Sequence, residues 1–389
     1  MAAALEASKN PNAQVVLFER QARLGKKLLA TGNGRCNLSN INACKGGYYG
    51  EDAAFSNYAI NQMPPDATLD WFQKLGLLTV TESTGRVYPY SDQANSVVDV
   101  LRFALEKPNI RLCLGAEVSK IAAADCGFAV TANEETVHCD KVIIACGGLA
   151  GTKLGGSMAG YKLLAKFGHR STKLRPALVQ LKTGWRGVAS LKGVRANCHV
   201  QILKDGNVHS ESTGELQFTD YGLSGPVIFE TSRDACYGPG KWTAKLDFLP
   251  QWEEAQLLQA LSTRPEFSTE ELLTGILHNR LGRVLCKAAG IGQCKVKDLS
   301  AGELAAVCKA VKAFEVSLTE PMGMDSAQVT AGGVLTADFD PMTMESRLVP
   351  GLYACGEVLD IDGDCGGYNL QWAWSSGCLA GCSAGKETL

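Results

Sequence analysis

The segment from Gly351 to Gly377, GLYACGEVLDIDGDCGGYNLQWAWSSG, constrains the fold of this chain more than any other stretch. Its pattern predicts a strand over residues 351–355, a carboxylate at Glu357, a glycine-rich loop at 366–367 and a helix that opens over 369–374. Ligands of open α/β sheets bind at the carboxyl ends of strands, and a helix N-terminus favours negative charge. The segment therefore predicts a flavin site in which Glu357 accepts hydrogen bonds from ribityl or ribose hydroxyls. An ordinary strand-turn-helix is the alternative.

Residues 15–40, VVLFERQARLGKKLLATGNGRCNLSN, point to the same kind of fold. A strand over residues 15–18 ends in Glu19, as the second strand of a dinucleotide-binding unit ends in an acid that binds the adenosine ribose. The glycines that follow permit tight backbone approach, and Lys26 and Arg35 offer cations to phosphate or carbonyl oxygens. A loop that wraps a cofactor is predicted, with a solvated surface loop as the alternative.

Both segments resemble the signatures of one bacterial family, the BaiN-type flavoproteins, also described as aminoacetone-oxidase-like NAD(P)/FAD-dependent oxidoreductases. Weaker similarity fills the interval, so the resemblance covers essentially the whole chain. It implies an α/β fold, in which an FAD/NAD(P)-binding Rossmann-like domain carries an inserted β-barrel and a helical subdomain. It also implies FAD as cofactor, NAD(P)H as the electron donor and a small-molecule substrate, either an enone of the bile-acid type or an amine.

The resemblance also implies which residues bind the cofactor. Those of the first signature are Glu19, Arg20, Lys26, Gly34, Arg35, Cys36 and Asn37; those of the middle of the chain are Val118, Gly147, Gly148 and Gly332; those of the last signature are Gly356, Glu357, Gly367, Tyr368, Asn369 and Leu370. No catalytic residue is identified, because Tyr88, Cys365 and Tyr368 are candidate proton donors by their place in the family motifs alone.

Changes of pattern along the chain predict the domain organisation. Residues 1–171 and 325–389 are assigned to the FAD-binding domain, 172–250 to the barrel, 251–313 to a helical insertion and 314–324 to a return strand of the barrel.

Two finer predictions concern segments inside these domains. Residues 110–139 alternate in short runs with turns between them, which predicts an antiparallel meander. In the helical insertion, the leucines and isoleucine of residues 272–277 fall on one helical face. Ser268 with Glu271, and Ser300 with Glu303 later in the chain, have the spacing of capping boxes.

The start of the chain departs from the family pattern. Residues 1–7 are expected to form the later turns of a helix, and the strand and GxGxxG loop that precede this helix in the family are missing from the sequence. The family pattern implies roughly 20 further residues there. Because that loop holds the FAD pyrophosphate, we expect a chain without it to hold FAD weakly. An inactive truncated flavoprotein is therefore one alternative function.

Composition argues against several other classes of protein. The net charge of −2 and the lack of a basic stripe argue against a nucleic-acid partner, although a flavoprotein of RNA modification is kept as an alternative. No apolar run approaches the roughly 20 residues of a membrane span, and Met1 does not begin a secretion signal. The histidines are isolated, so no metal site is expected. The oligomeric state is not predicted.

The fifteen cysteines indicate a reducing compartment. Their number is odd, they are scattered and no CxxC pair occurs, so we expect reduced, mostly buried thiols in a cytoplasmic protein. Cys36 lies where some flavoenzymes carry a CxxxxC redox pair, but the next cysteine is Cys44. A redox disulfide is therefore not expected there.

Overall fold

The computed structural model describes residues 1–386, which divide into two compact units. The first unit joins Met1–Arg175 to the part of the chain that begins at Gln328, and the second unit is Pro176–Ala327. A short strand, β11 (Arg175–Ala177), spans the division. The domain boundaries expected at residues 172 and 325 stay predictions.

The first unit contains helices and short strands in alternation. Its helices are α1 (Ala2–Ala7), α2 (Lys26–Ala30), α3 (Ser56–Gln62), α4 (Pro65–Lys74), α5 (Ala94–Ala104), α6 (Ala159–Ala165) and α11 (Tyr368–Ala384). Its strands are β1 (Val15–Glu19), β2 (Ser39–Asn40), β3 (Tyr48–Tyr49), β4 (Thr79–Thr81), β5 (Arg86–Pro89), β6 (Ile110–Leu114), β7 (Val118–Ala123), β8 (Phe128–Ala132), β9 (Glu135–Cys139), β10 (Val142–Ile144), β18 (Val329–Ala331), β19 (Leu352–Ala354) and β20 (Asp362–Gly363).

Two parallel strand pairs carry the predicted ligand edge of the first unit. β1 pairs with β6, which sets Glu19 opposite Leu114, and β10 pairs with β19, which sets Ile144 opposite Ala354. The strand predicted to end in Glu19 and the strand predicted before Glu357 are therefore confirmed. Glu19 is the last residue of β1 and Glu357 follows β19, so both acids lie at the carboxyl ends of parallel strands, where ligands of such sheets bind.

The predicted meander over residues 110–139 is partly wrong. Strands β7, β8 and β9 form an antiparallel sheet in that order, as predicted. Residues 110–114, however, form β6 and pair in parallel with β1. Alternation within a short strand does not specify its partner, because a strand that is half-buried has the same pattern in either kind of sheet.

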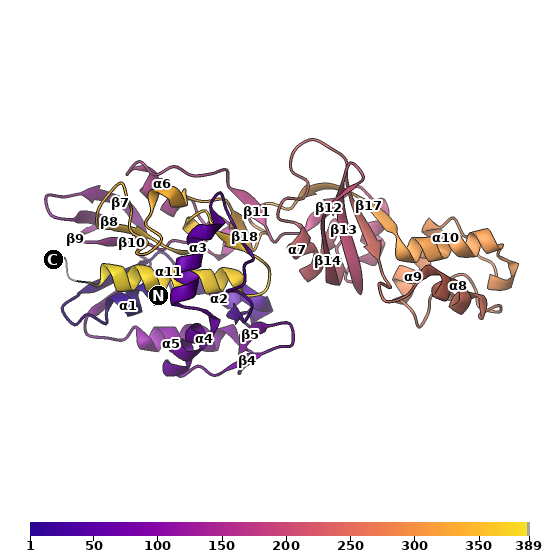
Figure 1. Ribbon diagram of the computed structural model, residues 1–389, viewed down its shortest axis with the longest axis horizontal. Helices are drawn as coiled ribbons and strands as arrows, with labels where there is room; N and C mark the ends of the chain where they lie inside the picture. The colour runs from indigo at the N-terminus through magenta and orange to yellow at the C-terminus, as the bar shows by residue number, and fades with distance from the viewer. Residues whose placement is uncertain (387–389) are drawn as a thin grey trace. The chain divides into compact units, whose positions relative to one another are not determined.

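Helix α11 runs through the first unit beside α1, as Figure 1 shows in yellow and indigo. Glycines on α11 allow this close approach: a Cβ on Gly381 would lie 2.2 Å from the carbonyl oxygen of Ala3. Trp372 on another face of α11 is 1% exposed and packs in the core with Leu352 and Val358. The helix is therefore fixed on two sides, and its N-terminus at Tyr368 is held firmly.

The second unit is a barrel with helices inserted between its strands. Six strands close the barrel in the order β12 (Leu181–Thr183), β15 (Gly222–Ser224), β14 (Asn207–Phe218), β13 (Arg195–Lys204), β16 (Trp242–Asp247) and β17 (Phe314–Pro321). Its helices are α7 (Pro226–Thr231), α8 (Glu254–Ser262), α9 (Asn279–Ala288) and α10 (Ala301–Lys312). An inserted barrel and a helical subdomain were both predicted, and both are present.

The helix predicted over residues 272–277 is wrong. Leu272 and Leu273 are buried at 0% and 1% exposure, but the chain there makes successive turns. Gly275 has φ +80°, which interrupts a right-handed helix. Ser268 does donate to the Glu271 carboxylate, yet no helix follows. Apolar residues at helical spacing can thus enter a core from a series of turns.

The capping box at Ser300 is confirmed at the start of α10, and it supplies a test. The Ser300 hydroxyl accepts from the Glu303 N–H at 3.2 Å, and the Glu303 carboxylate accepts from the Ser300 N–H at 2.8 Å. Ser300→Ala should cost α10 about 1 kcal/mol, so its amides should exchange with deuterium roughly fivefold faster. Ser268→Ala, which removes the same motif where no helix begins, should leave α10 exchange unchanged. Equal effects of the two variants would contradict the assignment.

Within residues 1–386, none of the helices combines the length and the apolar character that a membrane crossing requires.

Candidate functional site

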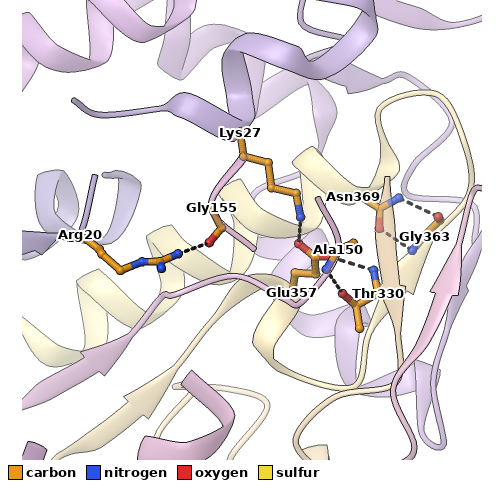
Figure 2. A network of polar contacts seen from close by, with 8 residues as sticks. All are labelled: Arg20, Lys27, Ala150, Gly155, Thr330, Glu357, Gly363 and Asn369. Carbon is orange, nitrogen blue, oxygen red and sulfur yellow. Dashed lines mark hydrogen bonds and ion pairs between the residues drawn. The ribbon is translucent and has the colours of Figure 1, made fainter. Parts of the chain in front are cut away.

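Glu357 lies at the meeting point of four segments of the first unit. It follows β19 in a 3-10 turn (Gly356–Val358), and Figure 2 shows the contacts of its carboxylate. Oε1 accepts from the Thr330 N–H at 2.9 Å, and Oε2 pairs with Lys27 Nζ at 2.6 Å. The Thr330 hydroxyl in turn accepts from the Ala150 N–H at 2.8 Å. Helix α2, strand β18, the loop after β10 and the turn after β19 are thus joined around one carboxylate.

The two glycines after β10 make room for this carboxylate. A Cβ on Gly148 would lie 2.7 Å from the Glu357 carboxyl carbon and 2.6 Å from Thr330 Oγ1. A Cβ on Gly147, where φ is +71°, would lie 3.9 Å from Glu357 Oε2. The structure therefore brings together three of the residues predicted from the sequence, Gly147, Gly148 and Glu357.

The lysine that contacts Glu357 is Lys27, which was not among the predicted residues, while the predicted cofactor role of its neighbour Lys26 stays a prediction. Lys26 donates to Gln21 Oε1 at 3.3 Å and does not contact Glu357. Consecutive residues of a helix point about 100° apart, so only one of the two can face the carboxylate. Two adjacent lysines at the first turn of α2 do not indicate from the sequence which of them contacts Glu357.

The glycine-rich loop forms the N-terminus of α11. Gly367 is the N-cap residue with φ +106°, and a Cβ there would lie 2.2 Å from the Ser39 carbonyl oxygen. The Asn37 side chain, oriented so that its amide satisfies its neighbours, accepts from the Gly367 N–H at 3.3 Å and donates to Ser39 O at 3.1 Å. Asn37 and Gly367, both predicted site residues, are therefore in direct contact although they belong to different signatures.

The other predicted residues at the start of α11 have mainly structural contacts. The Asn369 side chain accepts from the Gly363 N–H at 2.8 Å and donates to Gly363 O at 2.7 Å, which closes the loop before the helix (Figure 2). Tyr368 packs edge-to-face on Tyr48, with ring centroids 5.9 Å apart. Leu370 packs against the core that includes α1. The Asn369 side chain is thus engaged in closing the loop, and its predicted cofactor contact stays a prediction.

The charged residues of the first signature contact different partners. The Glu19 carboxylate accepts from the Gln21 N–H at 2.8 Å, and Arg20 donates to Gly155 O at 2.8 Å. Arg35 pairs with Asp92 and Glu82 and lies over the Tyr88 ring, 3.9 Å from its centroid. These carboxylates raise the pKa of the guanidinium, with Asp92 the larger cause.

The remaining predicted cofactor residues are Val118 and three glycines, and their surroundings differ. The Gly356 N–H donates to Ser376 Oγ at 3.0 Å. A Cβ on Gly332, where φ is +89°, would lie 2.6 Å from Lys173 O, whereas a Cβ on Gly34, where φ is +87°, would meet nothing within 4 Å. Val118 begins β7 and packs against the core. Gly332 and Gly356 thus require glycine for close packing or backbone conformation.

The candidate proton donors differ in access to a ligand. Tyr88 is 6% exposed, and burial raises the pKa of its hydroxyl above the ordinary value. Cys365 and Tyr368 are partly buried beside the glycine-rich loop. Which of the three donates a proton stays a prediction. In the described part of the chain, no cluster of three or more His, Cys, Asp or Glu side chains could hold a metal ion.

All fifteen cysteines are free thiols, but only six are buried, so the expectation that most are buried is wrong. Cys36 is fully buried, and desolvation raises its pKa to about 12. At pH 8 only about one thiol in ten thousand would be ionised, so Cys36 should resist alkylation by iodoacetamide. The exposed Cys44 should be labelled well before Cys36 when peptides are followed by mass spectrometry. Rapid labelling of Cys36 in the folded protein would contradict this.

Comparisons with known proteins identify the family of this chain. A model of the HI0933-like protein Rossmann domain matches residues 1–383. A protein of Clostridium scindens named 3-dehydro-bile acid delta(4,6)-reductase is 39% identical over 395 residues, which cover 100% of this chain and 96% of that protein. The ribosomal RNA dihydrouridine synthase of Escherichia coli is 33% identical over 367 residues, 93% of this chain and 90% of that protein.

Among solved structures, one of quinol-fumarate reductase with menaquinol aligns with 99% of this chain and 68% of that chain, with a TM-score of 0.49 and 16% identity. The family assignment rests on the sequences instead. The match to the Rossmann-domain model spans nearly every residue, and the Clostridium scindens protein matches the chain end to end. The predicted Rossmann-like fold and BaiN-type resemblance are confirmed, and the chain belongs to the HI0933-like family.

Proposed function

We propose that this protein is a cytoplasmic FAD-dependent oxidoreductase that reduces a carbon–carbon double bond conjugated to a carbonyl group, with NAD(P)H as electron donor. The observation that carries the proposal is the Glu357 carboxylate, which Thr330 and Lys27 hold after β19 and which lies against Gly148. A carboxylate fixed at the end of a parallel strand accepts hydrogen bonds from ribityl or ribose hydroxyls. When bound, FAD would supply hydride chemistry at its N5 atom.

The residues of the first unit fit the flavin half of FAD. Gly147 and Gly148 leave no side chain between backbone and Glu357, so a ligand hydroxyl can approach the carboxylate closely. The N-terminus of α11 follows Gly367, and its first amides lack partners within the helix. Such amides and the helix dipole favour negative charge at the pyrimidine edge of a reduced flavin. Glu19, the last residue of β1, is the candidate for the adenosine ribose.

The proposed substrate bond, a carbon–carbon double bond conjugated to a carbonyl group, is inferred from a reaction that two relatives share. The name 3-dehydro-bile acid delta(4,6)-reductase denotes reduction of double bonds conjugated to a 3-oxo group. Dihydrouridine synthase reduces the C5=C6 bond of uracil, which is conjugated to the C4 carbonyl. In both substrates the carbonyl accepts charge as hydride adds to the far carbon, and the near carbon then takes a proton. Reduction of such an enone therefore requires one hydride and one proton.

A small polycyclic enone is the proposed substrate, and uridine in RNA is the second candidate. The second is favoured by the 33% identity to the ribosomal RNA enzyme over 93% of this chain. Against it, the net charge of −2 provides little of the phosphate attraction on which RNA binding depends. The 39% identity to the bile-acid enzyme supports the first.

The test is an anaerobic assay of the purified full-length protein with FAD. NADH or NADPH should bleach the bound flavin, and a 3-oxo-Δ4,6 steroid acid should restore its colour with formation of the reduced steroid. Unmodified ribosomal RNA is the parallel substrate, with dihydrouridine measured by mass spectrometry. Formation of dihydrouridine without steroid reduction would select the RNA alternative. A protein that binds no FAD would overturn the proposal and favour an inactive flavoprotein.

A further inference from the structure

We infer that Lys27 positions Glu357 for the cofactor, an assignment that rests on the proposed function. Its Nζ lies 2.6 Å from Glu357 Oε2, and the two residues are 330 positions apart in sequence. The pair links the first turn of α2 to the turn after β19, two segments that come together only in the folded first unit (Figure 2).

The surroundings of this pair differ from those of a surface ion pair. The side chains of Lys27 and Glu357 are 32% and 20% exposed. In the surface pair Arg111–Glu135 of the same unit, the side chains are 51% and 62% exposed. Exposed pairs contribute about 0–1 kcal/mol because water and salt screen them. Water and salt screen the more sheltered Lys27–Glu357 pair less, so the Lys27 ammonium interacts more strongly with the Glu357 carboxylate.

Lys27 and the Thr330 N–H together fix the orientation of the carboxylate. Each engages one oxygen, Lys27 at Oε2 and the Thr330 amide at Oε1. An ionised carboxylate has about four lone-pair positions, so roughly two remain for ligand hydroxyls. The Lys27 ammonium also has three N–H donors, of which Glu357 takes one. Without Lys27, Oε2 would lose its partner and the carboxylate could turn away from the position in which hydroxyls reach it.

The experiment measures FAD affinity of the full-length protein, stripped of flavin and titrated with FAD by fluorescence quenching. Lys27→Gln should weaken binding about 10- to 30-fold, the loss expected from one hydrogen bond to a charged group. Lys27→Arg keeps the cation and should restore most of the affinity. Lys45→Gln is the control, because Lys45 is an exposed lysine of the same unit whose ammonium donates to Asn42 Oδ1 at 2.9 Å. Its affinity should stay within about twofold of wild type.

A double variant separates positioning from a general structural effect. If Lys27 acts through Glu357, the variant Lys27→Gln/Glu357→Gln should bind FAD no more weakly than Glu357→Gln alone. The FAD-free Lys27→Gln variant should still unfold in a single cooperative thermal transition, as Lys45→Gln does. Wild-type affinity of Lys27→Gln, no rescue by Arg, or additive losses in the double variant would overturn the inference. Failure of the wild-type protein itself to bind FAD would instead overturn the proposed function.

Discussion

Glu357→Gln should weaken FAD binding about 100-fold while the protein stays folded. The substitution keeps the shape of the side chain and a carbonyl oxygen that can accept from the Thr330 N–H. It removes the charge that pairs with Lys27 and that strengthens hydrogen bonds from ligand hydroxyls. Two charge-assisted hydrogen bonds weakened to neutral ones account for about 3 kcal/mol, hence the factor of about 100. Fluorescence titration with FAD measures this directly.

Glu135→Gln is the matched control for this variant. Glu135 lies on β9 of the same unit, with its side chain 62% exposed, and pairs with Arg111. Loss of an exposed ion pair should change neither flavin affinity nor the thermal midpoint measurably. If Glu357→Gln binds FAD as tightly as Glu135→Gln does, Glu357 is not a cofactor ligand and the flavin site must be sought elsewhere.

Gly367→Ala should destabilise the start of α11 by about 2–4 kcal/mol and abolish tight FAD binding. The backbone there has φ +106°, which residues with a side chain rarely adopt, and the new Cβ would lie 2.2 Å from Ser39 O. The loop cannot easily move, because Asn37 bonds both to the Gly367 N–H and to Ser39 O. Hydrogen exchange of the α11 amides measures the loss of stability.

Gly76→Ala isolates the backbone contribution to that loss. Gly76 follows α4 with φ +95°, and a Cβ there would meet nothing within 4 Å. Gly76→Ala should lower the free energy of unfolding by about 1 kcal/mol, the ordinary penalty for alanine at a glycine with left-handed backbone conformation. Equal losses for Gly76→Ala and Gly367→Ala would show that contact with Ser39 is unimportant, and that the loop is less tightly packed than the distances indicate.

Local patterns in the sequence were sufficient for several elements of the fold. The apolar run before Glu19 predicted β1, and the segment from Gly351 predicted β19 and α11. The spacing of Ser300 and Glu303 predicted the start of α10. In each case the signal lies within a few residues, because strand alternation, capping and glycine turns depend on neighbours in the chain.

The assignments that were wrong or missed have causes other than these local patterns. Residues 110–114 were assigned to an antiparallel meander and instead pair with β1. Residues 272–277 have helical spacing but pack through turns. The contact of Lys27 with Glu357 was not predicted. The pairing of residues 110–114 and the contact of Lys27 depend on partners far away in sequence, which no pattern within one segment specifies. The turns at 272–277 include Gly275, whose φ of +80° interrupts a helix.

The sequence alone determined the class of fold and placed acids and glycines at the carboxyl ends of the strands, because glycines, acids and strand patterns are local properties of the chain. Only the tertiary structure decided that Lys27 faces Glu357, that Gly148 must be glycine to admit this carboxylate, and that Asn37 binds the Gly367 N–H. These contacts join segments separated by hundreds of residues. They form because burial of the shared core brings the segments together, which is a property of packing rather than of any one stretch of sequence.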